Sequence, residues 1–460
     1  MKKSVKSSIL LMLAVLMLVS CVVGCAKQDA STVDVPKDEI VAEAPAVEND
    51  ETIVLEIAAF EGGYGIEYLQ KICEAFEESH PNVTIELTSN PKIEEIIRPQ
   101  MVAGDSPDVY YPGSLYNPFF RALLNEGQLM DLTDLFEEPG VDDDTPLKDQ
   151  IVDGFLQSTA CDPNQDGRIL CAPISICTRG MIYNKALFEE KGWEVPETWD
   201  EFFALGDKAK EEGYALMTYA GTYPEYLETM IMPSLASALG AEKVQQLSQF
   251  QEGILTTPEA KQVFDNVAKI GQGGYLLEGT VGMNHTQSQS EFILNKCLFC
   301  PNGDWLANEM ADAPHAEGFK YAIAPAPTLE KGQTVYTRST PDIWTVPIGA
   351  KNPEMAKEFI RFLYSDEAVK LFALAGILQC TKDAATLTEG MFDEAFTSMH
   401  EIDAYSTALV FNWRPDPDGS KIIMSEVVYN PISDVMTGKM SADEWRESIE
   451  AAFHKVNAGE

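Results

Sequence analysis

Apolar residues switch between two spacings along the first part of the chain, and this switching predicts strands interleaved with helices. Strand-like runs cover residues 52–60 (TIVLEIAAF), 82–89 (NVTIELTS) and 107–111 (PDVYY). Between them, residues 65–79 and 93–101 carry apolar side chains three and four positions apart, as one face of a helix does. Strands and helices in this alternation favour right-handed crossovers and a mainly parallel sheet.

Capping residues mark several later helices. In MIYNKALFEEKGWEVPETWDEF, Asn184 can cap a short helix, and Thr198 with Glu201 forms the capping box of a second helix. A helical hairpin is predicted in NPEMAKEFIRFLYSDEAVKLFALAG, where Asn352 is the expected cap and Pro353 the first helical residue. The C-terminal SADEWRESIEAAFHKV opens on one more capping box.

The N-terminus has the pattern of a secretion signal. Lysines precede the apolar run Ile9–Val19, which is short for a membrane span. Cys21 and Cys25 each end a stretch that resembles a bacterial lipoprotein box, and we favour Cys25 because polar and charged residues begin just after it. We therefore predict a lipoprotein signal peptide over 1–24 and a flexible tether over 25–50. Lipidation at Cys21, or a plain cleaved signal, is the alternative.

Length and charge narrow the class of protein. A chain of 460 residues favours two domains over one. The formal net charge of −40 repels nucleic acid phosphates and anionic lipid headgroups. We therefore expect no nucleic acid partner, and contact with a membrane only through a lipid anchor.

Motifs for catalysis are absent from the sequence. It contains no GxxxxGK[ST], HExxH or GxSxG, and its five histidines are scattered. Carboxylates are abundant, so a pair for glycoside hydrolysis is not excluded by counting, but no pattern isolates one pair. We expect a protein that is not an enzyme and carries no cofactor.

The cysteines give no framework of disulfides. Cys297 and Cys300 form a CxxC, but the segment resembles a strand end, and no second CxxC completes a zinc site. A redox-active CxxC would need a helix N-terminus to lower the pKa of its thiol, which a strand end does not provide. Cys161 and Cys171 flank a turn and could form a disulfide, although we favour free thiols.

One loop, DPNQDGRIL, has two interpretations. Asp162, Asn164 and Asp166 match the first oxygen ligands of an EF-hand-type calcium loop, with Gly167 at its turn. The bidentate Glu of such a loop is replaced by Pro173. Asp-Gly also marks a hairpin turn, which is the interpretation we favour, and we predict no metal site.

Several aromatic residues lie in predicted loops among small and polar neighbours. They are Tyr64 in FEGGYG, Tyr223 in TYAGTYPEY, Trp305 in NGDW, Trp344 in PDIW and Trp413 in NWRP. Sugar rings have apolar faces and polar rims, so flat aromatic side chains beside polar groups suit a sugar site. Packing in a core is the alternative for each of them.

The ordered set of motifs resembles family 1 extracellular solute-binding proteins of ABC transporters, the carbohydrate type that includes maltose-binding protein. The pieces are FEGGYG, HPNVTIEL, AGDSPDVYY, DGRILCAPIS, the segment at 181–202, NGDWLANEM, KNPEMAKEFIRFLYSDEAVKLFALAG and VMTGKMSADEWRESIEAAF. Each piece is weak alone, but together they cover nearly all of residues 51–460.

The resemblance implies an α/β, two-lobed periplasmic-binding-protein-like fold of class II, with mainly parallel sheets flanked by helices and a cleft between the lobes. The N-terminal lobe would comprise residues 51–174 plus 342–379. The C-terminal lobe would comprise residues 175–341 plus 380–460. The chain would cross between lobes near 174–178 and 340–344 and return to the C-terminal lobe after about Gln379, and the lobes would close like a hinge on a ligand.

The resemblance also implies a site and a role. Pro112 and the residues after it replace a tryptophan of maltose-binding protein, so maltose itself is not expected. The implied function is capture of a sugar or oligosaccharide by a lipid-anchored monomer on the extracellular face of the bacterial cytoplasmic membrane, and its delivery to the membrane subunits of an ABC importer. Alternatives are a surface glycoside-active enzyme, or a binder of a polyol, peptide or metal. The implied ligand-binding residues are Glu61, Tyr64, Tyr223, Trp305, Trp344, Trp413 and Arg414.

Overall fold

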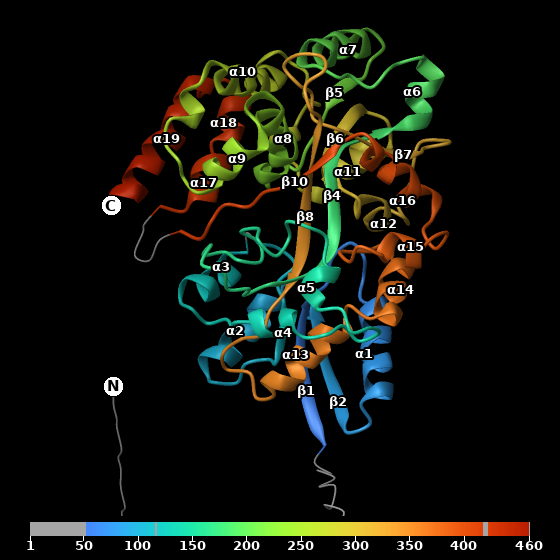
Figure 1. The fold of residues 1–460 in the computed structure, drawn as a ribbon. Coiled ribbons are helices and arrows are strands. Elements are labelled where there is room, and N and C mark those ends of the chain that lie inside the picture. Colours follow the sequence, from blue (N-terminus) through green and yellow to red (C-terminus); the bar gives the residue numbers. More distant parts are fainter. Residues whose placement is uncertain (1–51, 116, 417–421, 460) are drawn as a thin grey trace, which may run out of the picture. The chain divides into compact units, whose positions relative to one another are not determined.

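The computed structural model describes residues 52–115, 117–416 and 422–459, and within them the chain builds two sheets (Figure 1). Each sheet has a hydrophobic core of its own. We call the body around the first sheet lobe 1 and the body around the second sheet lobe 2. The predicted signal peptide, its Cys21 and Cys25, and the tether over 25–50 lie outside the described residues.

The sheet of lobe 1 is parallel, as the sequence predicts. Its strands are β1 (Ile53–Phe60), β2 (Val83–Asn90) and β3 (Val109–Tyr111), in the order β2-β1-β3. Ile57 of β1 is in register with Leu87 of β2 and Val109 of β3. The first helix buries the predicted face, which includes Leu69 and Phe76. The helices are α1 (Glu67–Ser79), α2 (Ile93–Val102), α3 (Pro118–Asn125), α4 (Thr133–Glu137), α5 (Leu147–Gln150), α13 (Pro353–Phe362) and α14 (Asp366–Leu374).

The sheet of lobe 2 is mixed, so the expectation of mainly parallel sheets is wrong here. β4 pairs antiparallel with β6, β7, β8 and β9, while β10 with β8 and β5 with β6 are parallel pairs. The strands are β4 (Ala172–Asn184), β5 (Ala215–Met217), β6 (Cys297–Gly303), β7 (Tyr321–Ala324), β8 (Tyr336–Trp344), β9 (Leu378–Gln379) and β10 (Thr407–Val410).

Two long strands, β4 and β8, connect the lobes. In β4, Ala172 belongs to the core of lobe 1 and Met181 to the core of lobe 2. In β8 the order is reversed, because Tyr336 packs on the core of lobe 2 and Trp344 lies in the core of lobe 1. The strands therefore run in opposite directions between the lobes, which gives their antiparallel pairing. Figure 1 shows both strands in the middle of the molecule.

Helices surround the sheet of lobe 2. They are α6 (Lys185–Lys191), α7 (Trp199–Glu211), α8 (Glu228–Leu239), α9 (Ala241–Ser248), α10 (Pro258–Gln272), α11 (His285–Ile293), α12 (Leu306–Glu309), α16 (Glu394–Met399), α17 (Met424–Tyr429), α18 (Ile432–Met436) and α19 (Ala442–Ala458). Short 3-10 helices are η1 (Pro224–Leu227), η2 (Ile254–Thr256), η3 (Thr280–Gly282) and η4 (His400–Ala404), and α15 (Ala384–Leu387) follows β9. Within the described residues, no helix is both long and apolar enough to cross a membrane.

Most predicted helix caps are confirmed. The Asn184 side chain accepts a hydrogen bond from the backbone of Ala186, and Thr198 with Glu201 forms a complete capping box. Asn352 stands at the start of α13 as predicted, but its side chain does not cap the helix. Its amide nitrogen donates to the carbonyl of Val54 in β1 at 2.9 Å, so this asparagine ties the helix to the sheet instead.

Candidate functional site

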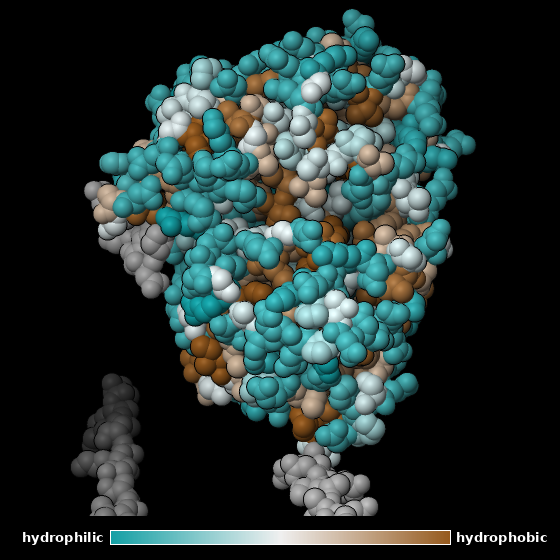
Figure 2. All heavy atoms as spheres, viewed as in Figure 1, coloured by the Kyte–Doolittle hydropathy of each residue, from teal (hydrophilic) through white to brown (hydrophobic). Residues whose placement is uncertain are grey.

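A narrow cavity of about 20 Å³ lies where the two lobes meet. The loop after β3 lines it from lobe 1, and the two connecting strands line it along their middle. Figure 2 shows hydrophobic residues reaching the surface along the boundary between the lobes, within a largely hydrophilic exterior. The cavity has room for about one water molecule. Its lining residues are Gly113, Ser114, Leu115, Arg179, Arg338, Thr340, Pro341, Asp342, Ile343 and Asn412.

Tyr64 connects the lobes beside this cavity. It lies in the loop after β1 and packs on the core of lobe 1, and its hydroxyl donates to Oδ1 of Asp304 at 2.8 Å. Asp304 follows β6 in lobe 2, and its Oδ2 accepts from the backbone nitrogen of Thr178 at 2.9 Å. Burial, followed by the negative charge of Asp304, raises the pKa of Tyr64 well above its ordinary value. Tyr64 therefore stays a hydrogen-bond donor.

Trp305 lies near the loop that carries Tyr64. Its half-buried ring lies against the guanidinium of Arg179, with the Arg179 carbon 4.8 Å from the ring centroid. The loop that carries Tyr64 also touches Trp305, because a Cβ built on Gly63 would lie 3.4 Å from it. A flat ring, a cation and a phenol from two lobes are thus brought together.

Carboxylates and a buried ion pair set the charge around the cavity. Asp342 accepts hydrogen bonds from the hydroxyl of Ser175 at 2.9 Å and from the thiol of Cys177 at 3.4 Å. Burial raises the pKa of Asp342 above its ordinary value. Arg338 pairs with Glu228, and both side chains are 2% exposed. The Arg338 charge is therefore neutralised within lobe 2.

Asn412 and Arg179 carry polar atoms that no described residue satisfies. Both the nitrogen and the oxygen of the Asn412 side-chain amide are buried without a hydrogen-bond partner, as is Nε of Arg179. Both residues line the cavity. An amide offers donors and an acceptor, and a guanidinium offers donors only, so together they match the mixed donor and acceptor character of sugar hydroxyls.

The structure places the other predicted site residues in different surroundings. Trp344 is 1% exposed and stacks on Tyr111 in lobe 1, with centroids 5.0 Å apart. Trp413 is 2% exposed, and its Nε1 donates to the hydroxyl of Tyr429 at 2.9 Å in lobe 2. Both indoles therefore lie in the lobe cores in this structure, and they do not line the cavity.

Tyr223, Glu61 and Arg414 are nearer the surface. Tyr223 is 43% exposed, and its ring stacks on His285 with centroids 4.0 Å apart. The hydroxyl of Ser89 donates to Glu61 at 3.4 Å. The Arg414 guanidinium lies over a phenylalanine ring of lobe 2, 4.4 Å from its centroid. None of the three lines the cavity.

Several residues of the site were missed by the sequence reasoning. Asp304 directly precedes Trp305 in NGDW, and Asn412 directly precedes Trp413, so both stood next to predicted positions. Arg179 is a cation inside the apolar strand segment ISICTRGMIY, which was a usable signal. His400 approaches Asp304 from a distant part of the chain, and no local pattern marks it.

The DPNQDG loop is a turn held by its own carboxylates. Asp162 accepts from the backbone nitrogens of Asp166 at 3.1 Å and Gly167 at 2.9 Å. Asp166 pairs with Arg168 at 2.7 Å. In the described part of the chain, no group of three or more histidine, cysteine or acidic residues is arranged to hold a metal ion. The geometry thus agrees with the turn interpretation.

The cysteines after the tether are buried free thiols. Burial raises the pKa of Cys300 to about 12, and it raises the pKa of Cys297 well above its ordinary value. A thiol with a raised pKa is a poor nucleophile and a poor metal ligand at neutral pH. Cys161 and Cys171 face each other across the turn, where Leu170 donates to the Cys161 carbonyl at 2.9 Å, without a disulfide.

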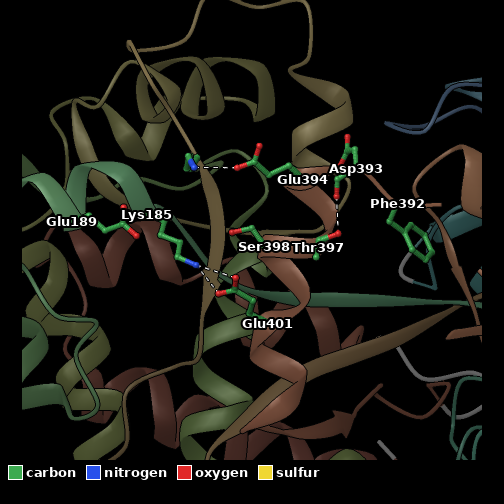
Figure 3. Close-up of a pocket in the computed structure, with 9 residues that line it drawn as sticks. Lys185, Glu189, Phe392, Asp393, Glu394, Thr397, Ser398 and Glu401 are labelled. Carbon is green, nitrogen blue, oxygen red and sulfur yellow. Dashed lines mark hydrogen bonds and ion pairs between the residues drawn. The ribbon is translucent and has the colours of Figure 1, made fainter. Parts of the chain in front are cut away.

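A larger hollow of about 380 Å³ lies on lobe 2, between α6 and α16 (Figure 3). Its lysines already have partners, because Lys185 pairs with Glu401 at 2.7 Å and Lys320 pairs with Glu394 at 3.1 Å. Phe392 is its only aromatic lining residue among those described. The hollow therefore lacks the unsatisfied polar groups found between the lobes, which remain the better candidate site.

Comparisons with known proteins agree with the architecture. A family model described as bacterial extracellular solute-binding protein matches residues 62–370. The diacetylchitobiose binding protein NgcE of Streptomyces coelicolor is 25% identical over 377 residues, covering 78% of this chain and 76% of that protein. The multiple sugar-binding protein of Streptococcus mutans is 23% identical over 322 residues, covering 66% of this chain and 69% of that protein.

Solved structures share the fold. RafE in complex with raffinose has a TM-score of 0.63 and 21% identity, and the match covers 88% of this chain and all 100% of that one. A chitin oligosaccharide binding protein has a TM-score of 0.67 and 18% identity, covering 89% of this chain and 100% of that one. At these identities the likeness concerns the fold alone, and it confirms the predicted two-lobed α/β architecture.

Proposed function

The chain belongs to the bacterial extracellular solute-binding protein family, as its motifs predict, and we propose that it captures a sugar or oligosaccharide between its two lobes. The observation that carries this proposal is the cluster at the lobe boundary. The ring of Trp305 lies beside Arg179, and Asn412 presents a buried amide without a partner in the described residues. The names of the relatives, which refer to diacetylchitobiose and to multiple sugars, support the same class of ligand.

Capture requires the lobes to move. The cavity of about 20 Å³ admits no sugar ring, so a sugar would enter after the lobes separate and be enclosed when they approach again. Contacts to both lobes would favour the closed arrangement by their differential affinity for it. We propose that the moving bodies are residues 51–174 plus 342–379 and residues 175–341 plus 380–460, a division supported by the two separate cores.

The ligand contacts remain a proposal. We place Tyr64 and Trp305 at the centre of the site, because the structure already joins their loops at the lobe boundary. Glu61, Tyr223 and Arg414 would form its outer parts. Trp344 and Trp413 lie in the lobe cores, and we propose that they stabilise the site through their packing in those cores.

Delivery to a membrane transporter is supported by the family and by the sequence. We propose that the protein is a lipid-anchored monomer, attached through Cys25 or alternatively Cys21, on the extracellular face of the cytoplasmic membrane. It would pass its sugar to the membrane subunits of an ABC importer without chemical change. The signal-like first residues and the family support this assignment.

A screen of sugars tests the proposed function. Mono- to tetrasaccharides are added to the purified protein, and the melting temperature is followed. A bound sugar raises it by mass action, about 2.7 kcal/mol of stabilisation at a hundred times Kd. Chromatography of the same samples should recover the sugar unchanged. Stabilisation by no sugar would overturn the proposal, and cleavage of the sugar would favour the glycoside-active alternative.

A further inference from the structure

His400 occupies a buried position between two carboxylates and an aromatic ring. Its Nδ1 lies 2.7 Å from Asp403, and its Nε2 lies 3.4 Å from Oδ2 of Asp304, with 10% of the side chain exposed. Phe396 of α16 stacks on the imidazole, with centroids 4.0 Å apart and planes 23° apart. The ring is therefore fixed in orientation, and each nitrogen faces an acid.

Asp304 connects His400 to lobe 1, because it accepts the hydrogen bond of Tyr64. Its side chain has no exposed surface, and an ionised carboxylate in such a place needs compensating donors. It accepts hydrogen bonds from the Tyr64 hydroxyl of lobe 1 and the backbone nitrogen of Thr178 on β4, and it faces His400 of η4 at ion-pair distance. His400 is the only one of these three that carries a full positive charge when protonated.

We propose that protonated His400 is a positioning residue, which compensates the buried carboxylate of Asp304, holds it oriented to accept the hydrogen bond of Tyr64 and thereby forms a proton-dependent latch between the lobes. The latch links groups from three separate parts of the sequence. Because the latch holds the lobes together, it would affect the proposed capture of sugar. The latch also acts in the sugar-free protein and can be tested there.

The direction of the pH dependence follows from the groups that face His400. Burial disfavours its charged form, but Asp304 and Asp403 favour that form more strongly, and Phe396 on the third side is uncharged. The net result is a pKa of about 9, above the ordinary 6.5. His400 is therefore protonated and the latch fully formed below about pH 6.5, and the latch is lost as the pH rises through about 9.

The other titratable groups beside Asp304 are a phenol, a thiol and a carboxylic acid, and burial raises the pKa of each of them. Tyr64 has a pKa well above its ordinary value of 10, so it remains a donor. Cys177 is a buried thiol whose pKa is likewise raised well above 9. Burial raises the pKa of Asp342 above its ordinary value of 3.8. A transition near pH 9 thus reports on His400.

The test measures the separation of the lobes in the sugar-free protein. Spin labels are attached at Val102→Cys on lobe 1, which is 85% exposed, and at Leu294→Cys on lobe 2, which is 44% exposed. The native cysteines within the described residues are buried and should take up little label. We expect one short distance at pH 6.5 and a shift toward longer distances at pH 10. His400→Gln should show the longer distances at both pH values.

Three further variants show whether His400 acts through Tyr64. Tyr64→Phe should also lengthen the distance, and adding His400→Gln to it should change nothing more. Asp403→Asn, at a half-exposed position, should move the transition to lower pH while leaving the imidazole in place. His315→Gln is the matched control, because His315 bonds Tyr321 within lobe 2 at 2.6 Å, and it should leave the transition unchanged.

The proposal is overturned if the distances of the wild-type protein do not respond to pH, or if His400→Gln and Tyr64→Phe have additive effects. It is equally overturned if Asp403→Asn leaves the midpoint unchanged, a result that does not depend on the folding of His400→Gln. Because no sugar is added, failure of the latch and failure of sugar binding are separate outcomes.

Discussion

In the proposed sugar site, Trp305, Arg179 and Asn412 are the side chains that would meet a hydroxyl-rich ligand. A buried amide without partners destabilises the protein on its own, by about 1–3 kcal/mol. Such a cost is offset when a ligand supplies the missing hydrogen bonds. The indole face and the guanidinium beside it add a surface on which a sugar ring can lie. Removing such an amide should therefore leave the protein at least as stable but weaken its binding of sugar.

Asn412→Ala should separate these two effects. Removing the unsatisfied amide should leave the unfolding free energy of the sugar-free protein unchanged or higher. It should also lower sugar affinity about tenfold, because about 1–1.5 kcal/mol of hydrogen bonding is lost. Urea denaturation and calorimetry measure the two quantities. Equal affinity in the variant would remove this amide from the site, and a large loss of stability would show that it has a structural role.

Trp305→Ala should lower sugar affinity by roughly tenfold or more while the protein stays folded, since a stacking aromatic contributes about 1–1.5 kcal/mol. Calorimetry with the sugar found by screening measures the change. Trp193→Ala is the matched control, because Trp193 is also half-buried but packs on Phe188 and Tyr214 within lobe 2. Similar losses in both variants would mean that the effect is not local to the site.

At the scale of elements, the sequence predicted what is local and missed what is distant. The capping boxes at Thr198 and Ser441 and the parallel order of the lobe 1 sheet depend on residues close together or on simple crossovers, and they are confirmed. The mixed sheet of lobe 2 was not predicted, because β4 and β8 pair over a long sequence separation. Asp304 with His400 is a tertiary contact of the same kind. Likewise, Asn352 donates to the carbonyl of Val54 in β1, a partner that its own sequence segment does not indicate.

Thr198→Ala tests the first capping box. The Thr198 hydroxyl accepts from the backbone of Glu201 at 3.3 Å, and its loss should lower the unfolding free energy by about 1 kcal/mol. Thr198→Ser retains the hydroxyl and should show little change. Sugar affinity should be equal in all three proteins, because the cap does not line the cavity. A weaker affinity in Thr198→Ala would show that α7 is coupled to the site.

At the scale of the whole molecule, two cores are joined by the two long strands β4 and β8, by the chain that follows β9, and by polar contacts between the lobes. Arg121 of lobe 1 pairs with Asp416 at 3.0 Å, and Thr159 donates to the carbonyl of Asn412 at 2.8 Å. Asn308 of α12 donates to the carbonyl of Ala375 at 2.9 Å. Individual hydrogen bonds have a net value of about 0.5–1.5 kcal/mol, so such a boundary can open and close without unfolding either core.

X-ray scattering of the purified protein, with and without the sugar identified by screening, tests most directly whether that sugar is held between two closing lobes. We predict a smaller radius of gyration at saturating sugar than in its absence, because contacts to both lobes favour the closed arrangement. Tight binding with an unchanged radius of gyration would contradict this account.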